Sequence, residues 1–416
     1  MLKFLLVPPI PIARPALIGL FLFFCAGFAD GAMIPFFPLW AKGEAGITTG
    51  YIGLLFGCYA GGELLATPLL GGIADRVGRR PVLILSACGV GSGFLALYFA
   101  HGVIAAAVIL VATGVFESVL HPTVWTVIAD TTPPENQRRN FSLAKVSSNA
   151  GRVLGPAAGA LLAFISLKWV FVASGAILLA GGAITLLCLP ETMGLGAAEE
   201  GEEEEEEGLA SLLPAFRDRR LAILLLWFLL LEVSGSWVEA VLPLYAHDTG
   251  MLTPSGVGLL FTYAAALIVI AQMLVSRIAA GRSALSLTLG AGTSFVIAFG
   301  ILCTTPSLLG VIIAVSLFSV AEMLIGPLVP TAVNQLAPPG RRATYMAATS
   351  VANDLKDSLG PAIGTALYAL SARLPWIAAI PLAAIAAVGL GGSLLQRSTT
   401  ASQARRSAVL RPPADH

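Results

Sequence analysis

Long apolar runs separated by short polar breaks fill the chain from about residue 15 to residue 395. About 20 residues of α-helix, each rising 1.5 Å, cross the hydrocarbon of a bilayer, so each run of that length predicts a membrane-spanning helix. Twelve spans are predicted, at about 15–38, 49–72, 81–100, 103–128, 142–165, 169–189, 221–246, 255–279, 284–303, 306–333, 344–370 and 374–395. The pattern therefore predicts an all-α polytopic membrane protein.

Composition excludes an ordinary soluble protein. The 416 residues are 56% apolar and 12% charged, and soluble chains carry about 25% charged residues. There is no basic domain for nucleic acid, no phosphate-cradling glycine loop and no ligand-spaced Cys/His cluster, so neither an enzyme nor a bound cofactor or metal is expected. The five cysteines all lie inside apolar runs and are expected to be packing residues.

Lysine and arginine predict the orientation, because they collect on the cytoplasmic side. With a cytoplasmic N-terminus, 18 of them fall in the termini and loops of that side, against three on the other, Lys42, Lys168 and Arg373. An even number of spans then leaves both termini in the cytoplasm, with the protein integral to the inner membrane.

The middle of the chain divides the spans six and six. Residues 193–220 include eight acids between Glu199 and Glu207 and cannot bury an apolar face, so they predict a solvated cytoplasmic linker. The expected organisation is an N-terminal six-helix half at 1–192, that linker, a C-terminal half at 221–396 and a cytoplasmic tail at 397–416.

The two halves are repeats related by a shift of 205 residues. Between 38–74 and 243–279 this shift gives 13 identities in 37 positions without a gap. It also brings the Leu-Gly-Pro-Ala of 154–157 onto that of 359–362. Two six-helix repeats in the same orientation imply a two-fold axis along the membrane normal, with a site between them near the midplane.

Residues 71–80, GGIADRVGRR, join the second and third predicted spans. The stretch resembles the G-x-x-x-D-R-x-G-R-R signature of the major facilitator superfamily, with its positions filled by Gly71, Asp75, Arg76, Gly78, Arg79 and Arg80. The resemblance implies the facilitator fold, a small-molecule substrate and a monomer. It also implies that Asp75 and Arg79 lock the halves together in the outward-open state, with Asp130 as the partner of Arg79.

The fifth span carries GRVLGPAAGA at 151–160. This resembles the glycine-proline motif of the superfamily's drug:proton antiporters, in which small residues let helices approach and proline bends the helix. The expected gate positions are Gly151, Gly155, Pro156 and Gly159, with Gly360, Pro361 and Gly364 in the repeat. One departure counts against antiport: Leu110 stands where drug exporters commonly carry an arginine.

Charged residues inside the spans indicate a function, because placing each one near the bilayer centre costs about 2.5–3.5 kcal/mol of insertion free energy. Eight acids and three bases fall there: Asp30, Glu63, Glu117, Glu232, Glu239, Glu322, Asp354 and Asp357, with Lys145, Arg152 and Lys356. Pairing every base still leaves five acids. These must be protonated or face water, as in a carrier that accepts protons or cations.

Asp30, in the middle of the first span, is the leading candidate for proton and substrate coupling, followed by Glu232 in the seventh. Lys145 and Arg152 share a face of the fifth span, and the repeat sets Arg152 against Asp357. The remaining coupling candidates are Glu63, Glu239 and Asp354. Glu117 and Glu322, which the repeat shift superimposes, are expected to have a structural role inherited by both halves.

The leading functional hypothesis is a proton-coupled exporter of an apolar or cationic small molecule, working by drug:proton antiport with alternating access. The alternative is a proton symporter that imports a small polar solute such as a sugar or organic acid, with Lys145 and Arg152 holding a carboxylate. Few amide side chains are available for a polar solute, which favours export. A sensor or scaffold would be expected to have lost its intramembrane charges.

Overall fold

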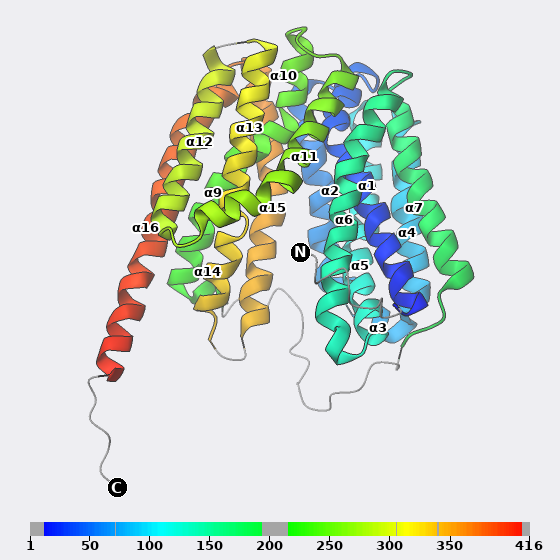
Figure 1. Cartoon of the computed structure of the whole chain (residues 1–416). Coiled ribbons are helices and arrows are strands. Elements are labelled where there is room, and N and C mark those ends of the chain that lie inside the picture. The colour runs from blue at the N-terminus through cyan, green and yellow to red at the C-terminus, as the bar shows by residue number, and fades with distance from the viewer. Residues whose placement is uncertain (1–11, 71, 194–214, 305, 339–340, 410–416) are drawn as a thin grey trace. The chain divides into compact units, whose positions relative to one another are not determined.

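The computed structural model of the chain describes residues 12–70, 72–193, 215–304, 306–338 and 341–409. Gly71, most of the predicted linker and the end of the predicted tail lie outside the described residues. All the regular elements within them are helices (Figure 1): α1 (Arg14–Gly43), α2 (Thr49–Leu70), α3 (Ile73–Val77), α4 (Arg79–Leu97), α5 (Gly102–Asp130), α6 (Pro134–Ala163), α7 (Lys168–Cys188), α9 (Arg219–Ala240), α10 (Leu242–Asp248), α11 (Pro254–Ala279), α12 (Ala284–Thr304), α13 (Leu308–Ile325), α14 (Leu328–Leu336), α15 (Arg342–Leu370) and α16 (Leu374–Val409).

These helices confirm the all-α membrane fold. Each predicted span coincides with one long helix, except that α9 with α10 forms the seventh and α13 with α14 the tenth. Nine of the described helical segments are long and apolar enough to cross a membrane. The other three long helices, α2, α6 and α15, stand where the second, fifth and eleventh spans are predicted, and α6 and α15 together carry five of the 11 charged residues expected inside the spans. The count of twelve spans fits this arrangement.

The chain forms two compact units. Unit 1 comprises Met1–Ile34 and Gly61–Glu204, and unit 2 comprises Pro35–Ala60 and Glu205–His416. The boundary therefore crosses α1 and α2, of which residues 35–60 pack with helices of the second repeat.

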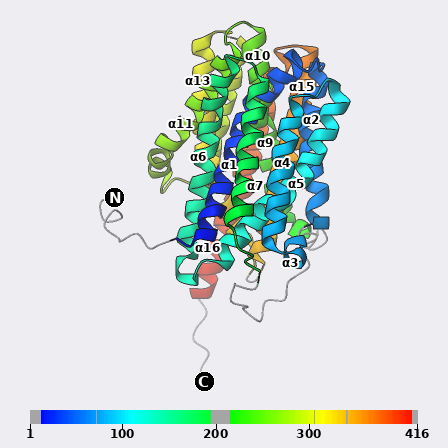
Figure 2. The same ribbon diagram turned by 90° about the vertical axis from the view of Figure 1, so that its right-hand side faces the viewer.

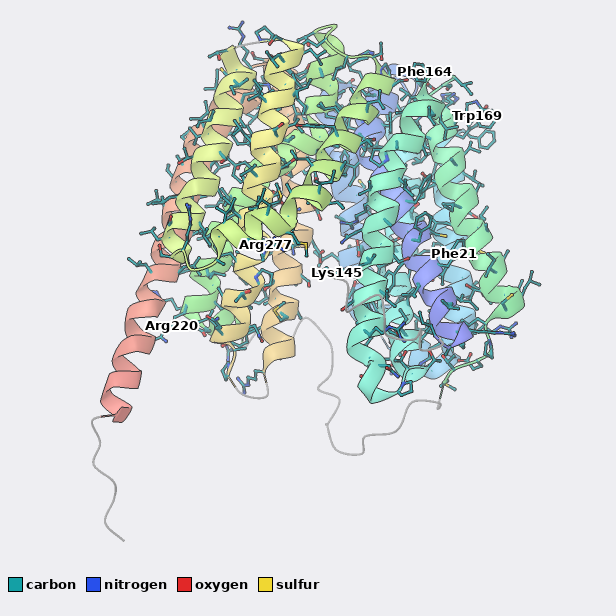
Figure 3. All side chains as sticks on the ribbon, in the orientation of Figure 1. Phe21, Lys145, Phe164, Trp169, Arg220 and Arg277 are labelled. Atoms are coloured by element: carbon teal, nitrogen blue, oxygen red, sulfur yellow. The ribbon has the colours of Figure 1, made fainter. Side chains whose placement is uncertain are left out.

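In unit 1, α4 packs along α5 and α7 (Figure 2). Gly91 and Gly175 make the close approach of α4 to α7 possible: a Cβ at Gly91 would lie 2.9 Å from the Gly175 carbonyl oxygen, and one at Gly175 would lie 2.6 Å from that of Gly91. Small residues at such crossings let membrane helices gain dispersion contacts where burial from water offers nothing. Phe164 and Trp169, at the turn from α6 to α7, project outward (Figure 3).

In unit 2, α12 packs between α16 and α13, and α9 packs along α15 and α16. Part of the core of this unit is aromatic, with Tyr245, Phe299 and Trp376 in ring contact. The Tyr245 hydroxyl donates to the Leu302 carbonyl 2.9 Å away, so the polar atom of the Tyr245 side chain has a hydrogen-bond partner inside the apolar core.

Candidate functional site

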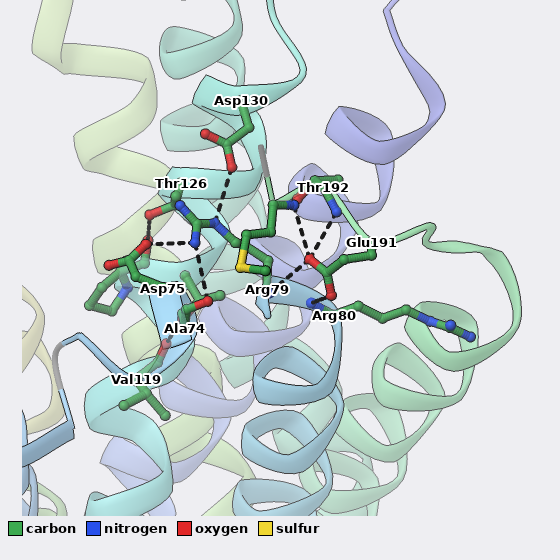
Figure 4. A network of polar contacts seen from close by, with 12 residues as sticks. Ala74, Asp75, Arg79, Arg80, Val119, Thr126, Asp130, Glu191 and Thr192 are labelled. Atoms are coloured by element: carbon green, nitrogen blue, oxygen red, sulfur yellow. Dashed lines mark hydrogen bonds and ion pairs between the residues drawn. The ribbon is translucent and has the colours of Figure 1, made fainter. Parts of the chain in front are cut away.

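The stretch that carries the sequence signature forms a charge network around Arg79 (Figure 4). Gly78 has a φ of 108°, a conformation that favours glycine, and it turns the chain between α3 and α4. The Arg79 guanidinium then lies between two acids: Nη1 is 2.6 Å from Asp75 Oδ1, and Nε donates to Asp130 Oδ2 at 3.1 Å. Its Nη1 also donates to the Ala74 carbonyl at 3.1 Å. The structure thus brings together three of the residues predicted to form the lock.

Glu191, which sequence reasoning missed, completes this network. Its carboxylate accepts four backbone N–H groups: those of Arg79 and Arg80, at 2.9 Å and 3.3 Å, and those of Thr192 and Met193, at 2.9 Å and 3.0 Å. The first two belong to the start of α4, where helical N–H groups have no partner within the helix. Burial raises the pKa of Glu191, but the backbone donors outweigh it and hold the pKa below its ordinary value.

Glu191 also gives a second reason for glycine at position 78. A Cβ on Gly78 would lie 2.6 Å from Glu191 Oε2 and would displace the carboxylate from the helix end. Arg80 reaches the same region, donating from Nη2 to the Leu186 carbonyl at 2.7 Å. The end of α7 and the segment that follows are therefore tied to the turn between α3 and α4.

Within the membrane part of unit 1, α1 and α6 meet along two reciprocal glycine pairs. Gly31 would place a Cβ 2.6 Å from the Arg152 carbonyl oxygen, and Gly155 would place one 2.5 Å from that of Phe28. Gly27 and Gly151 lie closer still to the opposite backbone, since a Cβ on either would collide with a carbonyl oxygen of the other helix. Two of the predicted gate glycines therefore allow backbone contact between α1 and α6 in this conformation.

This α1–α6 seam brings the leading coupling candidate to its cation. Asp30 lies one residue before Gly31 and Arg152 one residue after Gly151, and Asp30 Oδ2 is 3.6 Å from Arg152 Nη2. The Asp30 side chain is 22% exposed and that of Arg152 is 59% exposed, so the pair is open on its Arg152 side. Another cation can therefore replace the Arg152 guanidinium beside Asp30 without displacing buried side chains.

A second acid lies deeper in unit 1. The Glu117 side chain on α5 is 5% exposed, and its Oε1 is 3.4 Å from Nε2 of His121, one turn further along the helix. Glu63 is half-buried on α2. Lys145 is exposed on α6 (Figure 3), and within the described part of unit 1 it is not brought into an ion pair with Asp30.

In unit 2 the charges gather around Lys356, a residue that the sequence prediction left out of the site. Its Nζ lies 3.2 Å from Asp357 Oδ1 and 3.8 Å from Glu232 Oε2. Glu232 is nearly buried on α9, whereas the Asp357 side chain is 54% exposed. Glu239 and Glu322 also act electrostatically on Lys356. Lys356 is the base in the middle of a predicted span of the second half, whereas Arg277 stands at the end of one, and that signal was available from the sequence.

The glycines of α15 position this second cluster as those of α6 position the first. A Cβ on Gly364 would lie 2.7 Å from Trp237 Cδ1, and one on Gly360 would collide with Ser236. Both contacts are with α9, the helix that carries Glu232. Pro156 and Pro361 lie inside helices that continue through them. Across the described residues, no group of three His, Cys, Asp or Glu side chains is placed to hold a metal ion.

A family model described as the Major Facilitator Superfamily matches residues 19–356. The chain is 26% identical over 312 residues to the uncharacterized MFS-type transporter YttB of Bacillus subtilis, covering 74% of this chain and 76% of that protein. It is 25% identical over 234 residues to the multidrug resistance protein MdtG of Escherichia fergusonii, with 54% and 55% covered. The chain therefore spans about half the length of this second relative.

Among solved structures, the nucleoside transporter NupG superposes with a TM-score of 0.75 at 12% identity, over 92% of this chain and 99% of that one. A likeness at this identity shows a shared fold.

Proposed function

Because the chain belongs to the Major Facilitator Superfamily and is a transporter rather than an enzyme, we propose that it exports an apolar or cationic small molecule in exchange for protons. The observation that carries the proposal is the Asp30–Arg152 pair, a carboxylate in a membrane-spanning helix whose only described cation is held loosely at 3.6 Å and is largely exposed. Similarity to a protein named for multidrug resistance supports export.

Charge balance explains how such a site couples two species. A carboxylate inside a membrane is stable only with a cation or a proton beside it. In the resting carrier Arg152 supplies that charge. A substrate cation or a proton that binds Asp30 releases Arg152 to the exposed side, and the two ligands exclude each other because each neutralises the same carboxylate. In unit 2, Lys356 plays the same part for Glu232 and Asp357.

Transport then requires two alternating states. We take the moving bodies to be the six-helix halves at 1–192 and 221–396, and the Arg79 network to be the inner lock. Its interaction partners, Asp75, Asp130 and the Glu191 carboxylate, connect α3, α4, α5 and the segment after α7. We place the carrier in the inner membrane as a monomer with both termini in the cytoplasm.

The test uses inside-out vesicles with an acidic lumen and a fluorescent pH reporter. Adding ethidium is expected to release lumenal protons in vesicles with the wild-type carrier. Asp30→Asn, which keeps the shape but cannot hold a charge, is expected to abolish the response. Glu44→Gln, an acid-to-amide change just after α1, is the matched control and is expected to respond as wild type. An unchanged response of Asp30→Asn would refute the role of Asp30.

The same assay decides between export and the alternative of proton-coupled import. Arg152 is exposed enough to bind a substrate carboxylate, which favours that alternative. An importer would give no response to ethidium, and a sugar or organic acid added outside the vesicles would not release lumenal protons. Loaded inside the vesicles, such a solute would leave together with protons and collapse the gradient. That result would replace the export proposal.

A further inference from the structure

Aromatic side chains from three helices of unit 1 meet around Trp125. The centroid of the Trp125 ring on α5 lies 4.6 Å from that of Phe23 on α1 and 5.5 Å from that of Phe141 on α6. Phe23 also contacts the His121 ring, at 5.6 Å. All these residues belong to the same compact unit. Phe23, Trp125 and Phe141 are called the Trp125 cluster below.

The Trp125 ring is held by its neighbours but is not covered by them. Both neighbouring rings meet it at a steep angle, 53° for Phe23 and 74° for Phe141, so neither is stacked parallel on the indole. Trp125 is 37% exposed, whereas Phe23 is 4% exposed. The indole is thus fixed in orientation by two rings and still presents aromatic surface to a third.

Trp125 lies on the face of α5 that carries ionisable groups. Trp125, His121 and Glu117 are spaced four residues apart and so share one face of the helix. Asp30 on α1 and Arg152 on α6 both act electrostatically on His121, so this face is turned toward the Asp30–Arg152 pair. Ionisable groups in a membrane face the protein interior or water rather than lipid. Trp125 is therefore not one of the tryptophans that anchor a protein in the lipid interface.

The indole and the Asp30 carboxylate lean toward one another, because α1 and α5 run in opposite directions. A Cβ on Gly19 of α1 would lie 3.0 Å from Ile128, whereas Phe23 contacts Trp125, so rising numbers on α1 meet falling numbers on α5. Asp30 follows Phe23 by seven residues, or about 10 Å along α1. Side chains tilt toward the N-terminus of their own helix. Trp125 and Asp30 therefore converge from the two ends of this interval.

The charges beside this interval favour a cation. The acids are short and held in the structure, since the Glu117 side chain is 5% exposed and that of Asp30 is 22% exposed. The bases on α6 are long and open to solvent, with the Arg152 side chain 59% exposed and Lys145 exposed as well. Long basic side chains can carry their charge out into water, whereas the two carboxylates stay in place. A ligand beside them therefore meets fixed negative charge.

We propose that the Trp125 cluster binds the aromatic ring of a cationic substrate, whose charge lies beside Asp30 in place of Arg152. Trp125 stands five residues, or about 8 Å, before Asp130 at the cytoplasmic end of α5 in the orientation that Lys and Arg predict. The ring is thus placed to meet a compound that enters from the cytoplasm. The position of the charge rests on the proposed function, whereas the binding of the ring is independent of proton coupling.

Two matched cations test the cluster, by equilibrium dialysis with the purified full chain in detergent. Tetraphenylphosphonium and tetrabutylphosphonium have the same charge, and only the first has aromatic rings. Trp125→Leu is expected to weaken tetraphenylphosphonium binding roughly three- to ten-fold, the size of one aromatic contact, and to leave tetrabutylphosphonium binding unchanged. Trp125→Phe keeps a ring and is expected to lose less. Trp169→Leu removes an exposed tryptophan outside the cluster and is expected to bind both cations as wild type does.

A photoreactive aromatic cation locates the ring site in the unaltered protein, so the test does not depend on how well a variant folds. Ethidium azide, activated by light, is expected to attach to peptides that contain Phe23, Trp125 or Phe141, as identified by mass spectrometry. An excess of tetraphenylphosphonium is expected to prevent this attachment. Attachment confined to other parts of the chain would overturn the proposal.

The dialysis measurements also separate the cluster from the proposed function. Asp30→Asn is expected to weaken both phosphonium ions alike, because it removes the charge that both of them use. Equal tetraphenylphosphonium affinities of wild type and Trp125→Leu, at an unchanged melting temperature, would refute the ring site and leave Asp30 in its role. Unchanged binding by Asp30→Asn, together with the selective loss in Trp125→Leu, would refute the role of Asp30 and retain the ring site.

Discussion

The α1–α6 seam makes it possible to distinguish close packing from hinge motion. A methyl group added at Gly155 would lie 2.5 Å from the Phe28 carbonyl oxygen, and one at Gly31 would lie 2.6 Å from that of Arg152. Carbon atoms settle at about 3.5–4.0 Å from non-bonded neighbours, so either change pushes the helices apart by roughly 1 Å. Overpacking of this kind costs about 1–3 kcal/mol, against which alanine gains up to about 1 kcal/mol as a better helix former.

Thermal unfolding of the purified protein in detergent, followed by tryptophan fluorescence, measures this cost. Gly31→Ala and Gly155→Ala are each expected to lower the apparent melting temperature by on the order of 1–3 °C. The double variant is expected to lose less than the sum, because the first methyl already opens the crossing that the second occupies. Gly300→Ala is the control: it lies within α12 with nothing within 4 Å of the added methyl, and its melting temperature should not fall.

Transport by the same variants separates the two interpretations. If the glycines serve close approach, Gly31→Ala and Gly155→Ala impair transport alike, because both move Asp30 away from Arg152. If Gly155 is instead a flexing point beside Pro156, only Gly155→Ala stops transport. That second result, with both melting temperatures unchanged, would refute the packing argument.

Three further predictions concern the two charge networks. Backbone donors lower the pKa of Glu191 from its ordinary 4.5, so its ionised form stabilises the fold above about pH 4.5, and that stability is lost as the pH falls through the lowered pKa. The Glu191→Gln variant should therefore have a lower melting temperature than wild type at pH 7, and the difference should shrink in acid. Lys356→Met leaves the nearly buried Glu232 without its cation and should cost about 3–5 kcal/mol, most of which the double variant with Glu232→Gln should restore in a melting experiment. Arg79→Lys keeps the charge, but an ammonium group cannot contact Asp75 and Asp130 together as the planar guanidinium does. The variant should lose about 1–2 kcal/mol of stability, measured as a lower melting temperature. A melting curve like that of the wild type would show that the bond to Asp130 contributes nothing.

Patterns that repeat over many residues were predictable from the sequence. Apolar runs of span length leave a helix as the one way to satisfy the backbone in lipid, so each predicted span corresponds to a helix. The pairing of Arg79 with Asp130 was instead implied by the resemblance of residues 71–80 to the facilitator signature, and Arg79 Nε does lie 3.1 Å from Asp130 Oδ2. The helices are thus a local property of the sequence, whereas this contact was expected only from the family.

Contacts between distant segments were not predictable in the same way. Glu191 follows α7 and acts on the start of α4, and only the packed structure brings these two ends together. The unit boundary at Pro35 and Gly61 has the same origin: the repeat in the sequence relates segments by descent, whereas the units follow from which helices are packed together. Gly27 and Gly31 were overlooked because their importance lies in what α6 brings against them.

Lys356 was left out of the predicted site for a geometric reason. The repeat shift carries Asp30 onto Gly235 and Arg152 onto Asp357, which suggested that the second half had acids where the first has a cation. On a helix, however, Glu232 lies three residues before Gly235 and on the same face, and Lys356 directly precedes Asp357. Each six-helix half therefore holds an acid on its first long helix and a base on its fifth, although the shift aligns neither pair. The two halves have in common which helices carry the paired charges, and alignment of single residues at a fixed shift does not detect this.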